Sequence, residues 1–99
     1  MDEIKIISDA LRCYGVEHQT FVAIEELSEL QKELCKYLRD EGGSIDHLAE
    51  EVADVEIMLA QLKYAFCINS DVARHKRFKL GRLVMRIAAK RAAQGNERR

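Results

Sequence analysis

Proline and tryptophan are absent from this 99-residue sequence, and glycine occurs only five times. A chain with so few helix breakers and long stretches of helix formers predicts an all-α fold. No apolar run approaches the roughly 18 residues needed to cross a bilayer, which argues against a membrane protein. The three cysteines are widely spaced and odd in number, which argues against a disulfide framework and a thiolate zinc site. We expect Cys13, Cys35 and Cys67 to be small apolar residues in or near the core.

Neither sign of charge is in excess, because 16 basic and 17 acidic residues give a net charge of −1. This balance excludes a broadly basic nucleic-acid binder. The length predicts a single domain over residues 1–99, with a frayed tail at 96–99. The opening Met1-Asp2-Glu3 lacks the basic-then-apolar pattern of a secretory signal, so we expect a cytoplasmic location.

Apolar residues at helical spacing predict four helices, over residues 2–14, 17–39, about 45–67 and about 70–93. Gly15 can end the first helix, and Ser44 is a good N-cap for the third. The short turn at 40–43 predicts that the second and third helices are antiparallel neighbours.

Each of these two helices carries an apolar stripe, which we expect to face the core. The stripes comprise Ala23, Ile24, Leu27, Leu30, Leu34 and Leu38 on one helix, and Leu48, Val52, Val55, Leu59, Leu62 and Phe66 on the other. Four aromatic residues are expected to lie in the core or at a subunit contact: Phe21, Tyr37, Tyr64 and Phe66.

Two acidic pairs border these stripes. Glu26 shares a helix face with Glu29, and Glu51 shares one with Asp54, because each pair is three residues apart. In the folded hairpin the two pairs are offset by roughly one helical turn, about 5 Å, which long side chains can absorb. Four converging carboxylates would repel one another and take up protons unless a cation compensated their charge. Such an all-oxygen site suits Mg²⁺ or Mn²⁺.

Two other interpretations of the acidic pairs remain open. The carboxylates could be solvated, or could pair with Lys32 and Lys36. A di-iron site is a further competitor, but it normally needs E-x-x-H on two helices. Asp54 stands where that histidine would be, and His47 precedes Glu51, so the pattern favours Mg²⁺ or Mn²⁺.

The run Glu25-Glu26-Leu27-Ser28-Glu29, followed 21 residues later by Glu51-Val52-Ala53-Asp54, resembles E-E-x-x-E…E-x-x-D. This is the signature of the MazG-like all-α nucleoside triphosphate pyrophosphohydrolases, and the resemblance covers about residues 10–87. It implies Mg²⁺-dependent hydrolysis of a nucleoside triphosphate to the monophosphate and pyrophosphate. It also implies a homodimer or homotetramer in which helical hairpins assemble into four-helix bundles. Carried onto this chain, it implies that Glu26, Glu29, Glu51 and Asp54 hold Mg²⁺, with Mn²⁺ as a substitute. Glu25 would be a second-metal ligand or would orient the attacking water.

The last expected helix is basic. Lys79, Arg82 and Arg86 share one face, and Lys79–Ile87 resembles the K-L-x-R-L-x-x-R-I helix of the same family. The resemblance implies that these cations bind the polyphosphate, a task that suits arginine. The alternative is a solvated amphipathic face. Gln19, on the same face as Glu26, could touch the sugar or base of a substrate, or could equally cap its helix.

The sequence therefore predicts a Mg²⁺-dependent nucleotide pyrophosphohydrolase. An alternative from another class is a non-catalytic helical dimerisation or regulatory module that has kept the fold. A helical nucleic-acid-binding protein ranks last, because only the final helix is basic.

Overall fold

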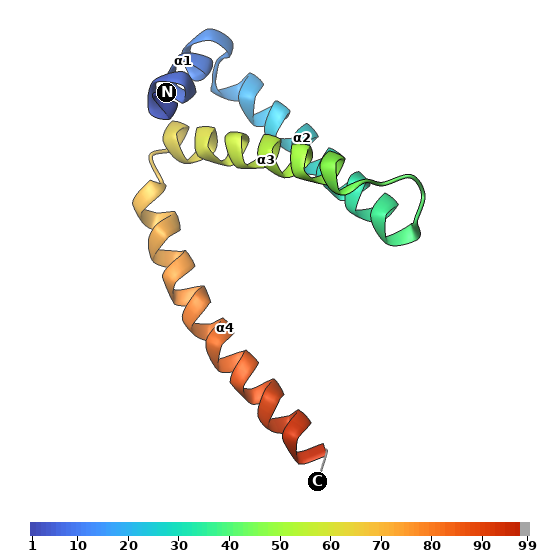
Figure 1. Ribbon diagram of the computed structural model, residues 1–99. Helices are drawn as coiled ribbons and strands as arrows, with labels where there is room; N and C mark the ends of the chain where they lie inside the picture. The colour runs from blue at the N-terminus through green and yellow to red at the C-terminus, as the bar shows by residue number, and fades with distance from the viewer. Residues whose placement is uncertain (98–99) are drawn as a thin grey trace. The chain divides into compact units, whose positions relative to one another are not determined.

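The computed structural model describes residues 1–97, which form four helices joined by short connections (Figure 1). The helices are α1 (Glu3–Tyr14), α2 (Val16–Arg39), α3 (Ile45–Ala65) and α4 (Asn69–Glu97). The predicted all-α class is therefore confirmed. The chain forms two compact units, one from Met1 to Cys67 that holds α1, α2 and α3, and one from Ile68 onward that holds α4.

The junction between α1 and α2 is set by a cap and a glycine. Asp2 accepts a hydrogen bond from the Lys5 backbone nitrogen at 3.2 Å and so begins α1. The Gly15 N–H donates to the Leu11 carbonyl at 2.9 Å and so ends α1 as predicted. Gly15 has φ 88° and ψ 154°, a conformation that only glycine adopts without strain. This sharp break lets α2 begin at the next residue.

Helices α2 and α3 form the predicted antiparallel hairpin (Figure 1). Ser44 caps α3 by accepting from the His47 backbone nitrogen at 3.0 Å. Gly43 lies so close to α2 that a Cβ there would come within 2.7 Å of the Tyr37 nitrogen. The tight turn therefore needs glycine at this position.

The two hairpin helices meet through only part of their apolar stripes, with Ala23 and Val55 as the buried stripe residues. The buried residues are Gln19 and Ala23 on α2, and Val55, Met58 and Gln61 on α3. Much of each stripe stays exposed, as at Ile24 (55%), Leu38 (82%) and Leu59 (45%). The expectation that the stripes face this chain's core is therefore wrong over most of their length. A hairpin covers only one side of each helix, and here the covered sides are those that carry the carboxylates.

The interior of this unit is too thin to bury the cysteines and aromatic residues. All three cysteines, Cys13, Cys35 and Cys67, are exposed, so the expectation that they line the core is wrong. Phe21, Tyr37, Tyr64 and Phe66 are exposed as well, which excludes them from this core. Whether they form subunit contacts remains a prediction.

Helix α4 is longer than the sequence predicts. It continues past residue 93 through Asn96 to Glu97, because alanines at 88, 89, 92 and 93 favour helix and no proline intervenes. Fraying of the tail at 96–99 remains a prediction, and Arg98 and Arg99 lie outside the described residues. Over residues 1–97, no helix is long and apolar enough to cross a membrane.

Candidate metal centre

Three carboxylates meet between the hairpin helices. Glu26 comes from α2, and Glu51 and Asp54 come from α3. One oxygen of each lies within 4.8 Å of the others. Glu26 and Glu51 are half-buried, whereas Asp54 is exposed. The predicted convergence of acidic residues from both helices is present for these three. The expected offset of about one helical turn between the two acidic pairs does not keep them apart.

This acidic triad, Glu26, Glu51 and Asp54, disfavours its own ionisation. Desolvation by burial is the largest cause that raises the pKa of Glu26 above its ordinary value. The charges of Asp54 and Glu51, a hydrogen bond with Asp54, and the charge of Glu29 raise it further. Desolvation also comes first in raising the pKa of Glu51, followed by the charges of Asp54 and Glu29. Without a cation, the folded hairpin therefore concentrates negative charge that it does not neutralise.

The protein's own cations do not compensate the triad. One oxygen of Glu51, Oε2, is buried and has no hydrogen-bond partner. Lys36, which the sequence offers as a partner, instead lies 3.7 Å from Glu33. Across residues 1–97, no lysine, arginine or histidine forms an ion pair with any of the three carboxylates. The interpretation that neighbouring lysines pair with these carboxylates is therefore not supported.

Glu29 and Glu25, the other predicted acidic site residues, lie outside the triad. Glu29 is exposed but near enough for its charge to raise the pKa of both Glu26 and Glu51. Glu25 is also exposed, one residue before Glu26 on α2. The metal-ligand role of Glu29 and the catalytic role of Glu25 remain predictions.

Gln19 lies in the hairpin interior. Its Nε2 donates to Gln61 Oε1 at 2.8 Å, and its Oε1 is 2.8 Å from His18 Nδ1. The start of α2 has no side-chain cap, so the interpretation of Gln19 as a cap is wrong. A contact between Gln19 and a substrate remains a prediction.

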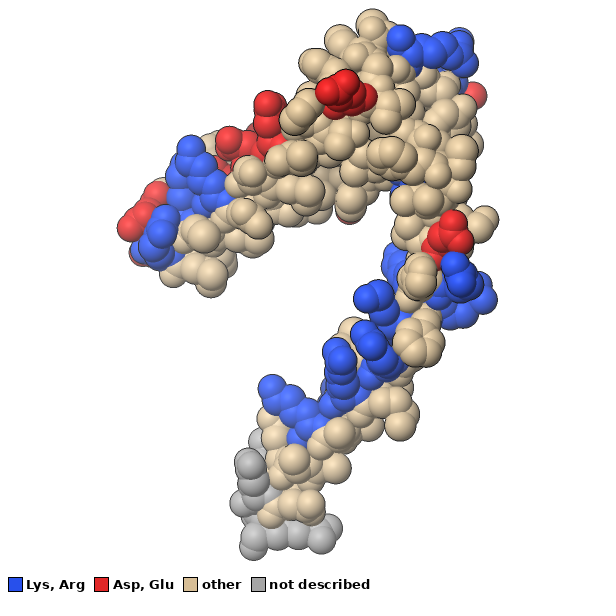
Figure 2. Space-filling model, turned by 180° about the vertical axis from the view of Figure 1, so that it is seen from behind, with Lys and Arg blue, Asp and Glu red and all other residues tan. Residues whose placement is uncertain are grey.

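The predicted phosphate-binding residues all lie on α4. Figure 2 shows Lys and Arg side chains gathered along this helix. The guanidinium of Arg82 lies 5.6 Å from the centre of the Phe78 ring, a cation–π contact within α4. Phosphate binding by Lys79, Arg82 and Arg86 remains a prediction.

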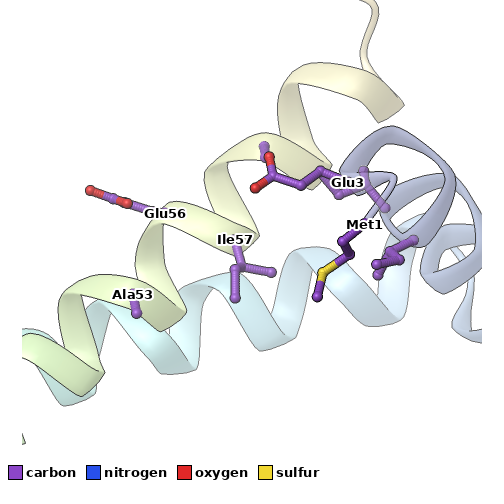
Figure 3. Close-up of a pocket in the computed structure, with 8 residues that line it drawn as sticks. Met1, Glu3, Ala53, Glu56 and Ile57 are labelled. Carbon is purple, nitrogen blue, oxygen red and sulfur yellow. The ribbon is translucent and has the colours of Figure 1, made fainter.

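A cavity of about 390 Å³ lies elsewhere, between α1 and α3. Apolar side chains such as Met1, Ile6 and Ile57 line most of it. Figure 3 shows that Glu56, one of its two acidic residues, points away from Met1. Because no group of polar side chains converges there, the cavity does not suit a charged ligand, and the triad is the stronger candidate.

Three further residues on α2 and α3 are not among the predicted site residues. Glu33 and Glu50 add to the negative charge that acts on Glu51. Gln61, the buried partner of Gln19, is also missed. Helical spacing is the signal that could find them, since Glu33 follows Glu26 by seven residues and Gln61 follows Asp54 by seven.

The donor chemistry of the triad fits a hard divalent cation. Carboxylate oxygens are the ligands that Mg²⁺ and Mn²⁺ prefer. Such an ion would be the positively charged partner that Glu51 Oε2 lacks. Fold and site together define an all-α protein with a carboxylate cluster between two antiparallel helices. No protein-family model, curated protein or solved structure matches this chain.

Proposed function

We propose that this protein is a Mg²⁺-dependent nucleotide pyrophosphohydrolase, with Mn²⁺ as a substitute ion. The reaction is hydrolysis of a nucleoside or deoxynucleoside triphosphate between the α- and β-phosphates, giving the monophosphate and pyrophosphate. The observation that carries the proposal is the triad, whose oxygens lie within 4.8 Å of one another and whose Glu51 Oε2 is buried without a partner. The reaction class comes from the resemblance of the two acidic motifs to MazG-like enzymes.

Each proposed role matches the chemistry of its residue. Glu26, Glu51 and Asp54 hold the cation, with Glu29 adding negative charge beside them. The cation supplies charge neutralisation for the phosphate oxygens, which phosphoanhydride hydrolysis requires. Glu25 orients the attacking water and accepts its proton, a role that its exposed position on α2 allows.

The resemblance to the MazG-like enzymes also gives the basic residues of α4 a role. Lys79, Arg82 and Arg86 bind the polyphosphate, because guanidinium groups match phosphate oxygens in charge and geometry. No nucleic acid or membrane takes part in this reaction.

Assembly is part of the same proposal. The exposed apolar stripes of α2 and α3 pack against a second hairpin, giving four-helix bundles in a homodimer or homotetramer. Exposed side chains such as Ile24 and Leu59 support this, since a large unpaired apolar surface marks an interaction site. The same surface favours the alternative function, a non-catalytic dimerisation or regulatory module.

Product analysis separates the two functions. The full chain is incubated with Mg²⁺ and a panel of ribo- and deoxyribonucleoside triphosphates, and the products are separated by ion-exchange chromatography. Monophosphate and pyrophosphate, lost in Asp54→Asn and kept in Glu56→Gln on the same helix, support the enzyme. Diphosphate with orthophosphate contradicts the cleavage position. An absence of turnover across the panel in a protein that binds the cation favours the non-catalytic module.

A further inference from the structure

A buried pair of glutamines joins α2 to α3 two helical turns from the acidic triad. Gln19 is only 7% exposed and Gln61 only 4%. The amide nitrogen of Gln19 donates to Gln61 Oε1 at 2.8 Å, and Gln61 Nε2 donates to Met58 Sδ at 3.4 Å. His18 Nδ1 lies 2.8 Å from the remaining amide oxygen of Gln19. The pair is therefore hydrogen-bonded throughout, as burial of polar groups requires.

Gln19 and Gln61 lie opposite each other in the same helix register as Glu26 and Asp54. Gln19 precedes Glu26 by seven residues, and Gln61 follows Asp54 by seven. Seven residues make about two turns of an α-helix, so each glutamine lies on the same face as its carboxylate. In an antiparallel hairpin, the register that joins Gln19 to Gln61 is therefore the register that brings Glu26 to Asp54.

A shift of one turn between α2 and α3 separates both pairs. Moving the register by four residues places Gln61 opposite Ala23 and Gln19 opposite Ala65. Alanine offers no side-chain hydrogen bond, so Gln19 Nε2 and Gln61 Oε1 would be buried without the partner that each has across the hairpin, which is unfavourable. The apolar contacts resist such a shift much less, because the hydrophobic effect is non-directional.

We propose that Gln19 and Gln61 are positioning residues, which fix the stagger of α2 against α3 and so assemble the acidic triad. A buried polar pair that specifies helix register is a known use of such groups. The statement about register depends on the hairpin alone, whereas its consequence for cation binding rests on the proposed function.

The test replaces both amides together, so that neither is left unpaired. Gln19→Met/Gln61→Met keeps the unbranched shape of glutamine and removes the hydrogen bond. Spin labels are attached to Cys35 on α2 and to a cysteine introduced by Glu56→Cys on α3, after Cys13 and Cys67 are changed to serine. Labelled protein is diluted with unlabelled protein, so that the measured distances lie within one chain. Mn²⁺ affinity is measured by titration of the same variants without labels.

We expect the double variant to remain helical by circular dichroism but to show a second label distance, displaced by about one turn or 5.4 Å. We expect its Mn²⁺ affinity to fall about tenfold or more, as when groups that orient metal ligands are lost. Gln31→Met, the same change at an exposed position of α2, should alter neither measurement. The pair Gln19→Leu/Gln61→Leu serves if the methionine variant does not fold.

The outcomes distinguish the two proposals. A label distance identical to wild type in the folded double variant overturns the role of the glutamines, whatever the Mn²⁺ affinity. A displaced distance in a protein whose wild type binds no Mn²⁺ supports the register role and contradicts the proposed metal centre.

Discussion

Glu51 illustrates how the hairpin creates its site at the scale of single residues. The side chain is half-buried, its Oε2 has no partner, and Asp54, Glu29, Glu33 and Glu50 all act on its charge. A carboxylate in this position destabilises the ionised, cation-free protein. Either a bound proton or a bound cation removes this cost, and carboxylate oxygens are suitable ligands for a cation.

The raised pKa values predict an unusual pH dependence. Folding raises the pKa of Glu26 and Glu51 above their ordinary value of 4.5, so the folded state binds more protons than the unfolded state above that pH. The contribution of the triad to stability is therefore greatest below that value and is lost as pH rises through the raised pKa values. In chelator-treated protein, Glu51→Gln should melt at a higher temperature than wild type at pH 7. The difference should shrink towards pH 5.

The control for this pH dependence is Glu56→Gln, an exposed position on the same helix. Its melting temperature should follow that of wild type at every pH. Melting curves by circular dichroism at half-unit pH steps provide the measurement. A constant difference between Glu51→Gln and wild type from pH 5 to pH 7 would contradict the electrostatic account.

Cation binding should reverse the electrostatic cost. At a free Mn²⁺ concentration of 100 times the dissociation constant, a single site adds about 2.7 kcal/mol to the free energy of unfolding. We expect this stabilisation in wild type and in Glu56→Gln, and its loss in Glu26→Gln and Asp54→Asn. Glu29→Gln should weaken it without abolishing it, because Glu29 lies outside the triad. Thermal shift measurements check the series, and full stabilisation of Asp54→Asn would remove Asp54 from the site.

At this scale, the sequence predicts the triad but not the residues that position it. Glu26, Glu51 and Asp54 can be predicted because spacing of three residues and a short turn define which carboxylates converge. Helical spacing places Gln61 on the same face as Asp54, but its burial cannot be predicted, because glutamine is usually exposed. Only the packing partner shows that this face is covered.

At the scale of the elements, the sequence predicts the helices and their order but not the faces that meet. Periodicity identifies an apolar stripe without showing what covers it. In α2 and α3 that stripe remains partly exposed, with only Ala23 and Val55 of its members fully buried, while Met58 is buried beside it. Gly15 and Ser44 are correctly predicted, because a helix boundary depends on local backbone chemistry.

Replacement by alanine should have opposite effects on stability at Gly15 and at Gly81. Gly15 has φ 88°, so Gly15→Ala should lower the free energy of unfolding by about 1–3 kcal/mol. Gly81 lies inside α4, and a Cβ there meets no atom within 4 Å. Gly81→Ala should therefore stabilise α4 by roughly 0.5–1 kcal/mol. Denaturation measures the loss of stability in Gly15→Ala. Amide hydrogen exchange within α4 measures the gain in Gly81→Ala. Faster exchange in Gly81→Ala would contradict the account of α4.

At the scale of the whole molecule, charge is divided sharply along the chain. Residues 1–67 contain fifteen acidic and six basic residues, whereas residues 68–99 contain two acidic and ten basic. Cations are attracted to the acidic segment, where the carboxylates gather, and anions such as phosphates are attracted to the basic segment. The overall charge of −1 hides this division, so whole-chain composition excludes less than it first suggests.

The exposed stripes predict self-association of the folded chain. Leu27 on α2 is 42% exposed and Leu59 on α3 is 45% exposed, and neither has a role in the acidic triad. Burying one such leucine contributes about 1.5–3 kcal/mol, so Leu59→Lys should weaken association by roughly tenfold or more. Gln31→Lys, at an exposed polar position on α2, should not weaken it. Sedimentation velocity at micromolar concentration provides the measurement. A stable wild-type monomer there would show that these stripes remain in water, and the proposed four-helix bundles would then have no interface on which to form.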